Sequence, residues 1–288
     1  MKLARFEAQG RRRLGVVHGD EISDLTAAGL PFATIDELIV AAEVLDLVRK
    51  YDVGPRLRLN EVRLLAPVSR PGKYLAIGMN YQKHLEEADK LGVARSKHQT
   101  WFNKQTSCLS GPFDDIQPGV TEQLDYEVEL GIVIGKRAKR VTQDEAIGHI
   151  FGYFVANDVS ARDWQFHSPT FTVGKSFDTH GPIGPWIVTA DEVEDPQQLD
   201  LRCYVNGELR QSNNTRNMIH RIDAQISYLS QAFTLEPGDL IATGTPEGVG
   251  IGMEPQVFLC SGDVVRCEID GIGAIENRVA SRGQPSMG

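Results

Sequence analysis

Short runs of apolar residues dominate the chain after residue 73. They are bounded by Gly, Pro, Asn or Asp, which is the pattern of short β-strands, and they cover 74–79, 126–135, 149–159, 184–190, 199–207, 239–244 and 263–270. Apolar residues at helical spacing are rarer and predict helices over 81–92, 142–150 and 220–233. Because strands and helices do not alternate regularly, a doubly wound parallel sheet is disfavoured. The pattern predicts an α+β fold, mainly β, with a mixed core and peripheral helices.

The first part of the chain predicts a small module of its own. Short strand-like pieces broken by glycines are followed by apolar residues at helical spacing over 33–51, which predict one amphipathic helix. The stretch 66–73 (APVSRPGK) has the proline and glycine content of a linker. We therefore expect a small N-terminal α+β module over 1–65 and a main domain over 66–288.

Composition narrows the class of protein. The net charge of -9 disfavours nucleic acid as a partner, because phosphate binding requires clustered Lys and Arg. The N-terminus lacks the apolar segment of a signal peptide, and no apolar run has the length of a membrane span. The four cysteines show no C-x-x-C spacing, as is usual for reduced thiols. These features predict a soluble, cytoplasmic protein without a membrane partner.

An acidic strand is the first candidate for chemistry. Strand geometry places Asp125, Glu127 and Glu129 on one face of the run 125–130. A solvated outer face is the ordinary explanation for such a pattern. The continuation 131–135 is apolar on both faces, however, and predicts a strand that enters the interior. Buried neighbouring carboxylates repel each other, and a bound cation would compensate them.

A third carboxylate follows the next buried strand. Asp158 follows the apolar run 150–156, where an acidic residue either forms a turn or belongs to a site. Together with Glu127 and Glu129 it would supply only oxygen ligands, a set suited to Mg²⁺, Mn²⁺ or Ca²⁺ rather than to zinc or copper.

A histidine–glutamate pair offers a general base. His84 and Glu87 are three residues apart on a predicted helix, so they are neighbours on one face. A carboxylate there can fix the imidazole tautomer and raise its basicity, although a surface pair of this spacing is common. The glycines in 243–250 match neither phosphate-binding motif, and a tight loop that brings backbone donors near a ligand explains them better.

Six segments, in this order, resemble the fumarylacetoacetate hydrolase superfamily. They are YLAIGMNYQKHLEEA, FNKQTSCLSGPFDDI, LDYEVELGIVIGKRAKRV, GYFVANDVSARDWQ, VGKSFDTHGPIGPWIVT and LEPGDLIATGTPEGVG, within residues 73–279. The resemblance implies a mixed β-roll that holds Mg²⁺ or Mn²⁺, for which Ca²⁺ can substitute in a crystal, in a homodimer. The N-terminal module is similar to that of the bacterial two-part members.

The resemblance also implies roles for single residues. Glu127, Glu129 and Asp158 match the metal ligands, while His84 and Glu87 match a catalytic dyad on a segment that closes over substrate. Lys175 matches a lysine near the ligand carbonyl. The positions that match further substrate contacts are Lys104, Arg162, Gln165, Gly244 and Thr245.

The chain departs from the family pattern at several places. Some members have an aspartate ligand shortly before the dyad histidine, where this chain has the segment 76–78 (Ala-Ile-Gly). The segment 165–175 is shorter than in related sequences. His180 stands where an aromatic or small residue is expected, and Glu247 where a proline is expected. These differences affect the prediction of the substrate more than that of the metal site.

The resemblance predicts an enzyme that acts on a small oxo acid or diketo acid. The leading hypothesis is hydrolysis of a carbon–carbon bond in a β-diketo acid of the acylpyruvate or fumarylpyruvate type. His84, oriented by Glu87, would activate water, and Lys175 would stabilise the oxyanion. The alternative on the same site is decarboxylation of a 2-oxo diacid such as oxaloacetate, or an isomerisation by tautomerisation. A non-catalytic binding protein is the third reading.

Overall fold

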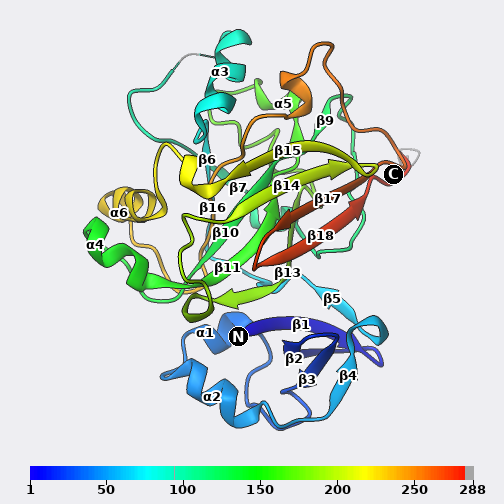
Figure 1. Cartoon of the computed structure of the whole chain (residues 1–288), viewed down its shortest axis with the longest axis vertical. Helices are drawn as coiled ribbons and strands as arrows, with labels where there is room; N and C mark the ends of the chain where they lie inside the picture. The colour runs from blue at the N-terminus through cyan, green and yellow to red at the C-terminus, as the bar shows by residue number, and fades with distance from the viewer. Residues whose placement is uncertain (94, 283–288) are drawn as a thin grey trace, which may run out of the picture.

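A large mixed sheet forms the frame of the molecule, whose computed structural model describes residues 1–93 and 95–282 (Figure 1). Its twelve strands include the path β4-β3-β2-β1-β13-β11-β10-β16-β6-β7, with β5 beside β1 and β8 beside β13. Most neighbours are antiparallel, and the pairs β16–β6 and β13–β8 are parallel. The strands are β1 (Lys2–Ala8), β2 (Arg11–His18), β3 (Glu21–Asp24), β4 (Arg56–Arg58), β5 (Arg63–Leu65), β6 (Tyr74–Gly78), β7 (Thr100–Lys104), β8 (Leu109–Ser110), β10 (Val128–Ile134), β11 (Ile150–Asn157), β13 (Gly181–Thr189) and β16 (Leu240–Ala242).

A second sheet packs against the middle of the first. It has the order β15 (Glu208–Asn214), β14 (Asp200–Val205), β17 (Val264–Ile269) and β18 (Gly273–Arg278). Leu130 and Ile132 of β10 share one buried cluster with Leu201 and Val265 of this sheet. A short pair, β9 (Leu124–Asp125) with β12 (Ser160–Ala161), leads into the site described below. One face of β10 is therefore covered by the second sheet, while the other presents Glu129 at the site and Val133 to a separate apolar cluster.

The helices lie outside the sheets, as expected for this fold class. They are α3 (Gln82–Lys90), α4 (Gln143–Ala146), α5 (Arg162–Gln165) and α6 (Ile222–Ala232), in addition to two in the N-terminal module. The mainly β fold with a mixed core is thus confirmed. Strands β7, β15 and β18 were not predicted, because their residues are largely polar or irregular and the backbone pairing defines them. In the described part of the chain, no helix combines the length and apolarity that crossing a membrane requires.

The N-terminal strands continue the main sheet. Leu3 of β1 pairs with Ile187 of β13, so the module is joined to the core by backbone hydrogen bonds as well as by the chain. Figure 1 shows this module at one end of the molecule and α3 at the other. The division into residues 1–65 and 66–288 stays a prediction.

The single helix expected over 33–51 is wrong. The structure has α1 (Ile35–Ile39) and α2 (Val44–Tyr51), separated by a turn in which Glu43 has a φ of 49°. Ile35 and Val48 nevertheless pack into the same apolar cluster. The two apolar faces therefore point in one direction, which is why the spacing of apolar residues predicts an uninterrupted helix.

Candidate metal and proton-transfer site

Three buried carboxylates meet at the ends of β10 and β11. Glu127 and Glu129 are two residues apart and face the same side of the strand, and the pairing of Val128 with Asn157 brings Asp158 next to Glu127. The backbone N–H of Asp158 donates to the carbonyl of Glu127 at 2.9 Å. One oxygen from each of the three carboxylates lies within 4.8 Å of the others. The strand pairing thus assembles the cluster that the spacing only indicated.

Buried cations surround two of the three carboxylates. Lys175 Nζ lies 2.6 Å from Glu127 Oε2 and 2.9 Å from Asp158 Oδ2. Lys104 Nζ donates to the other oxygen of Asp158. Arg162 Nη2 lies 2.6 Å from Glu127 Oε1. Burial would raise the pKa of Glu127, but the charges of Lys175 and Arg162 hold it below its usual range.

Among the described residues, no Lys or Arg forms an ion pair with Glu129. Its Oε2 accepts a hydrogen bond from the backbone N–H of Gly244 at 2.7 Å. Burial raises the pKa of Glu129 well above its usual value, and the neighbouring carboxylates Asp158 and Glu127 raise it further. A buried carboxylate of this kind, with two others in reach, fits a hard divalent cation and offers neither sulfur nor nitrogen ligands.

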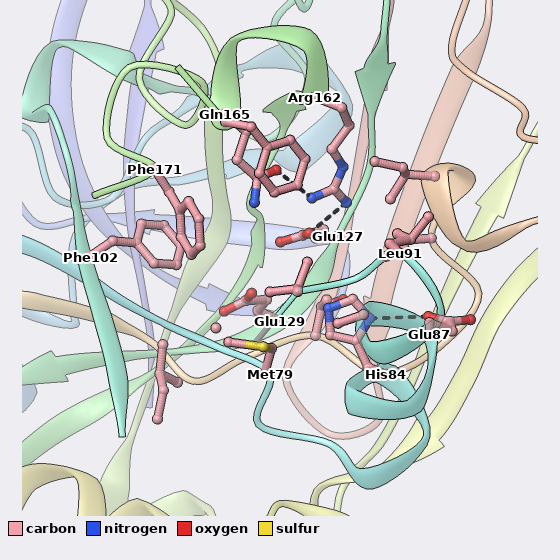
Figure 2. Close-up of a pocket in the computed structure, with 18 residues that line it drawn as sticks. Met79, His84, Glu87, Leu91, Phe102, Glu127, Glu129, Arg162, Gln165 and Phe171 are labelled. Carbon is pink, nitrogen blue, oxygen red and sulfur yellow. Dashed lines mark hydrogen bonds and ion pairs between the residues drawn. The ribbon is translucent and has the colours of Figure 1, made fainter. Parts of the chain in front are cut away.

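A cavity opens in front of the carboxylates, with an empty volume of about 630 Å³ that includes its open mouth. Figure 2 shows Arg162 and Gln165 on one side of Glu127 and Glu129, and His84 on the other. The remaining wall is apolar and comprises Ile77, Met79, Ala88, Leu91, Val93, Phe102, Phe166, Phe171, Val249 and Ile251. The cavity therefore has a charged end at the carboxylates and an extended apolar end.

His84 and Glu87 form the expected pair on α3. His84 Nδ1 lies 3.1 Å from Glu87 Oε2, and both side chains are largely buried. A carboxylate can only accept a hydrogen bond, so Nδ1 carries the proton and Nε2 is left as the basic nitrogen. Figure 2 shows that this second nitrogen points toward Glu129 and the cavity. The pair thus presents a base to whatever occupies the cavity.

The other expected site residues divide into two groups. Arg162, Gln165 and Thr245 line the cavity. Lys104 and Lys175 lie behind the carboxylates as counter-ions, and the N–H of Gly244 is bound to Glu129. Of the described residues that line the cavity, Arg162 and His84 are the basic ones. The geometry thus favours Arg162 and Gln165, rather than Lys175, as donors to a bound molecule.

Several contacts and backbone conformations in the site were not expected. Asp125 shares the period of Glu127, but its carboxylate binds Arg162 Nε at 2.9 Å and accepts from the N–H of Gly250 at 2.7 Å. Met79 and Phe171, with φ angles of 57° and 59°, are the apolar residues among the non-glycine positive-φ positions described. Both line the cavity. Such strained backbone is rare for bulky residues and is typical of functional sites, but no local sequence signal identifies it.

The residues that depart from the family pattern lie in or near the cavity, with one exception described below for His180. Ile77 and Gly78 line the cavity, so the segment 76–78 supplies no fourth carboxylate. The short segment after α5 contributes Phe166 and Phe171 to the apolar wall. Glu247 accepts a hydrogen bond from Asn213 at 2.7 Å.

His180 is buried behind the site and leads to a prediction about stability. Its Nε2 lies 3.0 Å from the carbonyl of Gln117, its ring stacks on Phe177, and Nδ1 has no partner. Burial lowers the pKa of His180 to about 3, and the charge of Lys104 contributes. Between about pH 3 and the ordinary histidine pKa of about 6.5, this side chain is protonated in the unfolded chain but neutral in the native protein. The free energy of unfolding therefore falls as pH falls through this range.

Replacing His180 should therefore flatten the acid limb of stability. His180→Asn is expected to reduce the slope of unfolding free energy against pH by about 1.4 kcal/mol per pH unit between pH 4 and 6. Urea denaturation at several pH values measures the slope, with His149→Asn as the matched control because His149 is not buried. An unchanged slope in His180→Asn would mean that His180 is protonated in the native protein.

Two models of known protein families match the chain. The model described as "Fumarylacetoacetate (FAA) hydrolase C-terminal" matches residues 73–280, and "Rv2993c-like, N-terminal" matches residues 1–67. A mitochondrial oxaloacetate tautomerase of Xenopus laevis is 46% identical over 97% of this chain and 90% of its own length.

Solved structures of the same fold also match. A fumarylacetoacetate hydrolase from the psychrophile Exiguobacterium antarcticum has a TM-score of 0.85 at 42% identity, covering 98% of this chain and 100% of that one. A maleylpyruvate hydrolase from Sphingobium sp. SYK-6, determined with manganese(II) and pyruvate, has a TM-score of 0.83 at 36% identity, covering 99% and 100%. By its sequence and its fold, the chain belongs to the fumarylacetoacetate hydrolase family, a family of enzymes whose members include hydrolases and tautomerases.

Proposed function

We propose that this enzyme catalyses the keto–enol tautomerisation of a small 2-oxo acid, with oxaloacetate as the first substrate to test. The observation that carries the proposal is the position of His84, a single oriented base that faces Glu127 and Glu129 of the carboxylate cluster across a cavity. Moving a proton next to a carbonyl requires one such base and no attacking water. The similarity to the oxaloacetate tautomerase supports the same reaction.

Different residues of the site would bind the substrate and transfer the proton. Arg162 and Gln165 would hold the carboxylate of the 2-oxo acid at the charged end of the cavity. In the enol-to-keto direction, His84 Nε2 takes the hydroxyl proton from the C2 oxygen and delivers it to C3. Glu87 keeps the imidazole in the tautomer that this transfer requires.

The charge of the site fits an anionic substrate once a cation is present. Glu127, Glu129 and Asp158 would hold Mg²⁺ or Mn²⁺, which draws electron density from the 2-oxo carbonyl and makes the adjacent proton more acidic. Lys104 and Lys175 already balance two of these carboxylates, so a divalent cation would make the charged end net positive. The choice of magnesium, the homodimer and the cytoplasmic location stay predictions.

Hydrolysis of an acylpyruvate is the second candidate. The apolar wall around Phe102, Phe166 and Phe171 favours it, because an acyl group would be buried there without an unpaired charge. Water would add to the distal carbonyl, the bond between C3 and C4 would break, and C3 would take a proton. It ranks second because Lys175, the expected oxyanion donor, is directed at Glu127 and Asp158.

Isotope labelling separates the two reactions. With Mn²⁺ and oxaloacetate in D₂O, we expect the enol absorbance to decay faster than with Mn²⁺ alone and deuterium to enter C3, while no new acid forms. With an acylpyruvate in ¹⁸O-water, ¹⁸O in the released acid would identify hydrolysis instead. If neither substrate is turned over above the metal-only rate, the proposed function is wrong.

A further inference from the structure

A glycine-rich loop, residues 244–252, contacts the carboxylate of Glu87 on α3. The backbone N–H of Gly248 donates to Glu87 Oε1 at 2.9 Å, while Glu87 Oε2 faces His84 Nδ1 at 3.1 Å. Each oxygen of the Glu87 carboxylate thus accepts one hydrogen bond, one from Gly248 and one from His84. A chain of contacts runs from a backbone amide through the carboxylate to the imidazole and ends at the nitrogen that faces the cavity.

Gly252 approaches the same carboxylate closely. A Cβ built on Gly252 would lie 2.9 Å from Glu87 Cδ and 3.1 and 3.2 Å from its two oxygens. The φ of Gly252 is not in the left-handed region, so the backbone there does not itself require glycine. Close approach to Glu87 is the reason the structure gives for a glycine at this position.

The same loop also donates hydrogen bonds to Glu129 of the carboxylate cluster and to the neighbouring Asp125. The N–H of Gly244 donates to Glu129, and the N–H groups of Gly250 and Ile251 donate to Asp125, which in turn binds Arg162. One loop therefore sets where Glu87 lies relative to the carboxylates across the cavity. A displacement of Glu87 would move the base, whereas the cluster keeps its own hydrogen bonds.

An ion pair forms a second contact between α3 and this loop. Lys83 Nζ lies 3.4 Å from Glu247 Oε1, at the position where related sequences are expected to have proline. The lysine is largely exposed, so this ion pair contributes little to stability. It lies on the same side of α3 as the loop and is consistent with α3 docking there.

We propose that Gly248 and Gly252 form a seat for the Glu87 carboxylate and act as positioning residues for His84. The N–H of Gly248 orients one oxygen, and the missing side chain of Gly252 leaves room for the whole group. The seat holds the other oxygen against His84 Nδ1 and so keeps the proton off Nε2. This inference rests on the proposed role of His84 as the base.

Gly252→Ala tests the seat with a single added methyl group. We expect kcat to fall by about 10²-fold, since a displacement of a catalytic group by about 1 Å has that effect. Metal affinity, measured by titration with Mn²⁺, should not change. Nitrogen-15 NMR of the ring should show the wild-type His84 in the Nδ1–H form and the variant in a mixture of forms. Gly148→Ala is the matched control, because a Cβ there meets nothing within 4 Å.

A double-mutant cycle distinguishes positioning from general damage. In a Glu87→Ala background the carboxylate is gone, so adding Gly252→Ala should cost no further activity. If Gly252→Ala lowers kcat equally in both backgrounds, the seat is not the cause and the inference is overturned. If the single variant fails to fold while the double variant folds, the clash with Glu87 is confirmed.

Glu87→Gln provides a test that does not depend on Gly252. The Gln amide would accept from Gly248 with its oxygen and donate to His84 with its nitrogen, so Nε2 should become the protonated nitrogen in the NMR spectrum. A ring still protonated at Nδ1 would overturn the seat. If His84→Ala keeps full activity, the proposed function fails instead. If His84→Ala is inactive and Gly252→Ala is fully active, only the seat is wrong.

Discussion

His84→Ala is expected to lower kcat by about 10²–10⁴-fold, the contribution that one general base makes. The imidazole is the basic group on its side of the cavity, it is oriented by Glu87, and Glu129 lies across from it. Metal binding should be unchanged, because His84 makes no hydrogen bond to the three carboxylates. Steady-state kinetics on oxaloacetate with saturating Mn²⁺, together with a Mn²⁺ titration, would measure both quantities.

Two further variants serve as comparisons for the effect of His84→Ala on kcat. His149→Ala removes a histidine that does not line the cavity and should leave kcat unchanged. Glu87→Ala should produce a smaller loss than His84→Ala, because the base remains but loses its orientation. Unchanged turnover in His84→Ala would remove the dyad from the mechanism and leave proton transfer to solvent. A loss of Mn²⁺ affinity would show instead that the imidazole takes part in metal binding.

Two substitutions in the carboxylate cluster should both weaken metal binding but differ in their effect on stability. Asp158→Asn removes the charge that Lys104 and Lys175 share, and leaving buried ammonium groups without it should destabilise the metal-free protein by about 3–5 kcal/mol. Glu129→Gln removes a carboxylate that has no cationic partner and keeps the oxygen that accepts from Gly244. The metal-free Glu129→Gln protein should therefore be as stable as the wild type or more stable.

Denaturation in the presence of a chelator provides the measurement. Urea unfolding of both variants and the wild type gives the stabilities, and titration with Mn²⁺ gives the affinities, which should fall at least about 10²-fold in each variant when one of three ligands is lost. If Glu129→Gln were destabilised as strongly as Asp158→Asn, Glu129 would have an ionic partner in the metal-free protein. Full Mn²⁺ affinity in either variant would exclude that carboxylate from the ligand set.

The local features of the site could be predicted because they depend on short spacings. Strand geometry puts Glu127 and Glu129 on one face whatever surrounds them, and the three-residue spacing of His84 and Glu87 makes them neighbours on any helix. The structure confirms both arrangements. Asp158 stood out at the end of the next buried strand, and the resemblance matched it to a metal ligand. Its position beside Glu127 follows from the pairing of β10 with β11.

The features that local patterns could not predict are contacts between residues that lie far apart in the sequence. Lys175 was expected to face a substrate carbonyl, but its ammonium group is directed at the carboxylates behind the cavity, a position set by the turn after α5. The loop that seats Glu87 lies 161 residues away from it. No periodicity near Glu87 can reveal such a partner, because it depends on how β16 and α3 are placed by the sheet.

Sequence by itself therefore determined the mainly β fold, the acidic strand and the histidine–glutamate pair, all of which are encoded in spacings of two or three residues and in the apolar pattern. Only the tertiary structure decided how these parts face one another. It paired β1 with β13, divided the expected first helix into two, and brought Phe171 into the apolar wall of the cavity. The physical reason is that strand register and loop closure are set by the summed packing of the whole core, which no local segment carries.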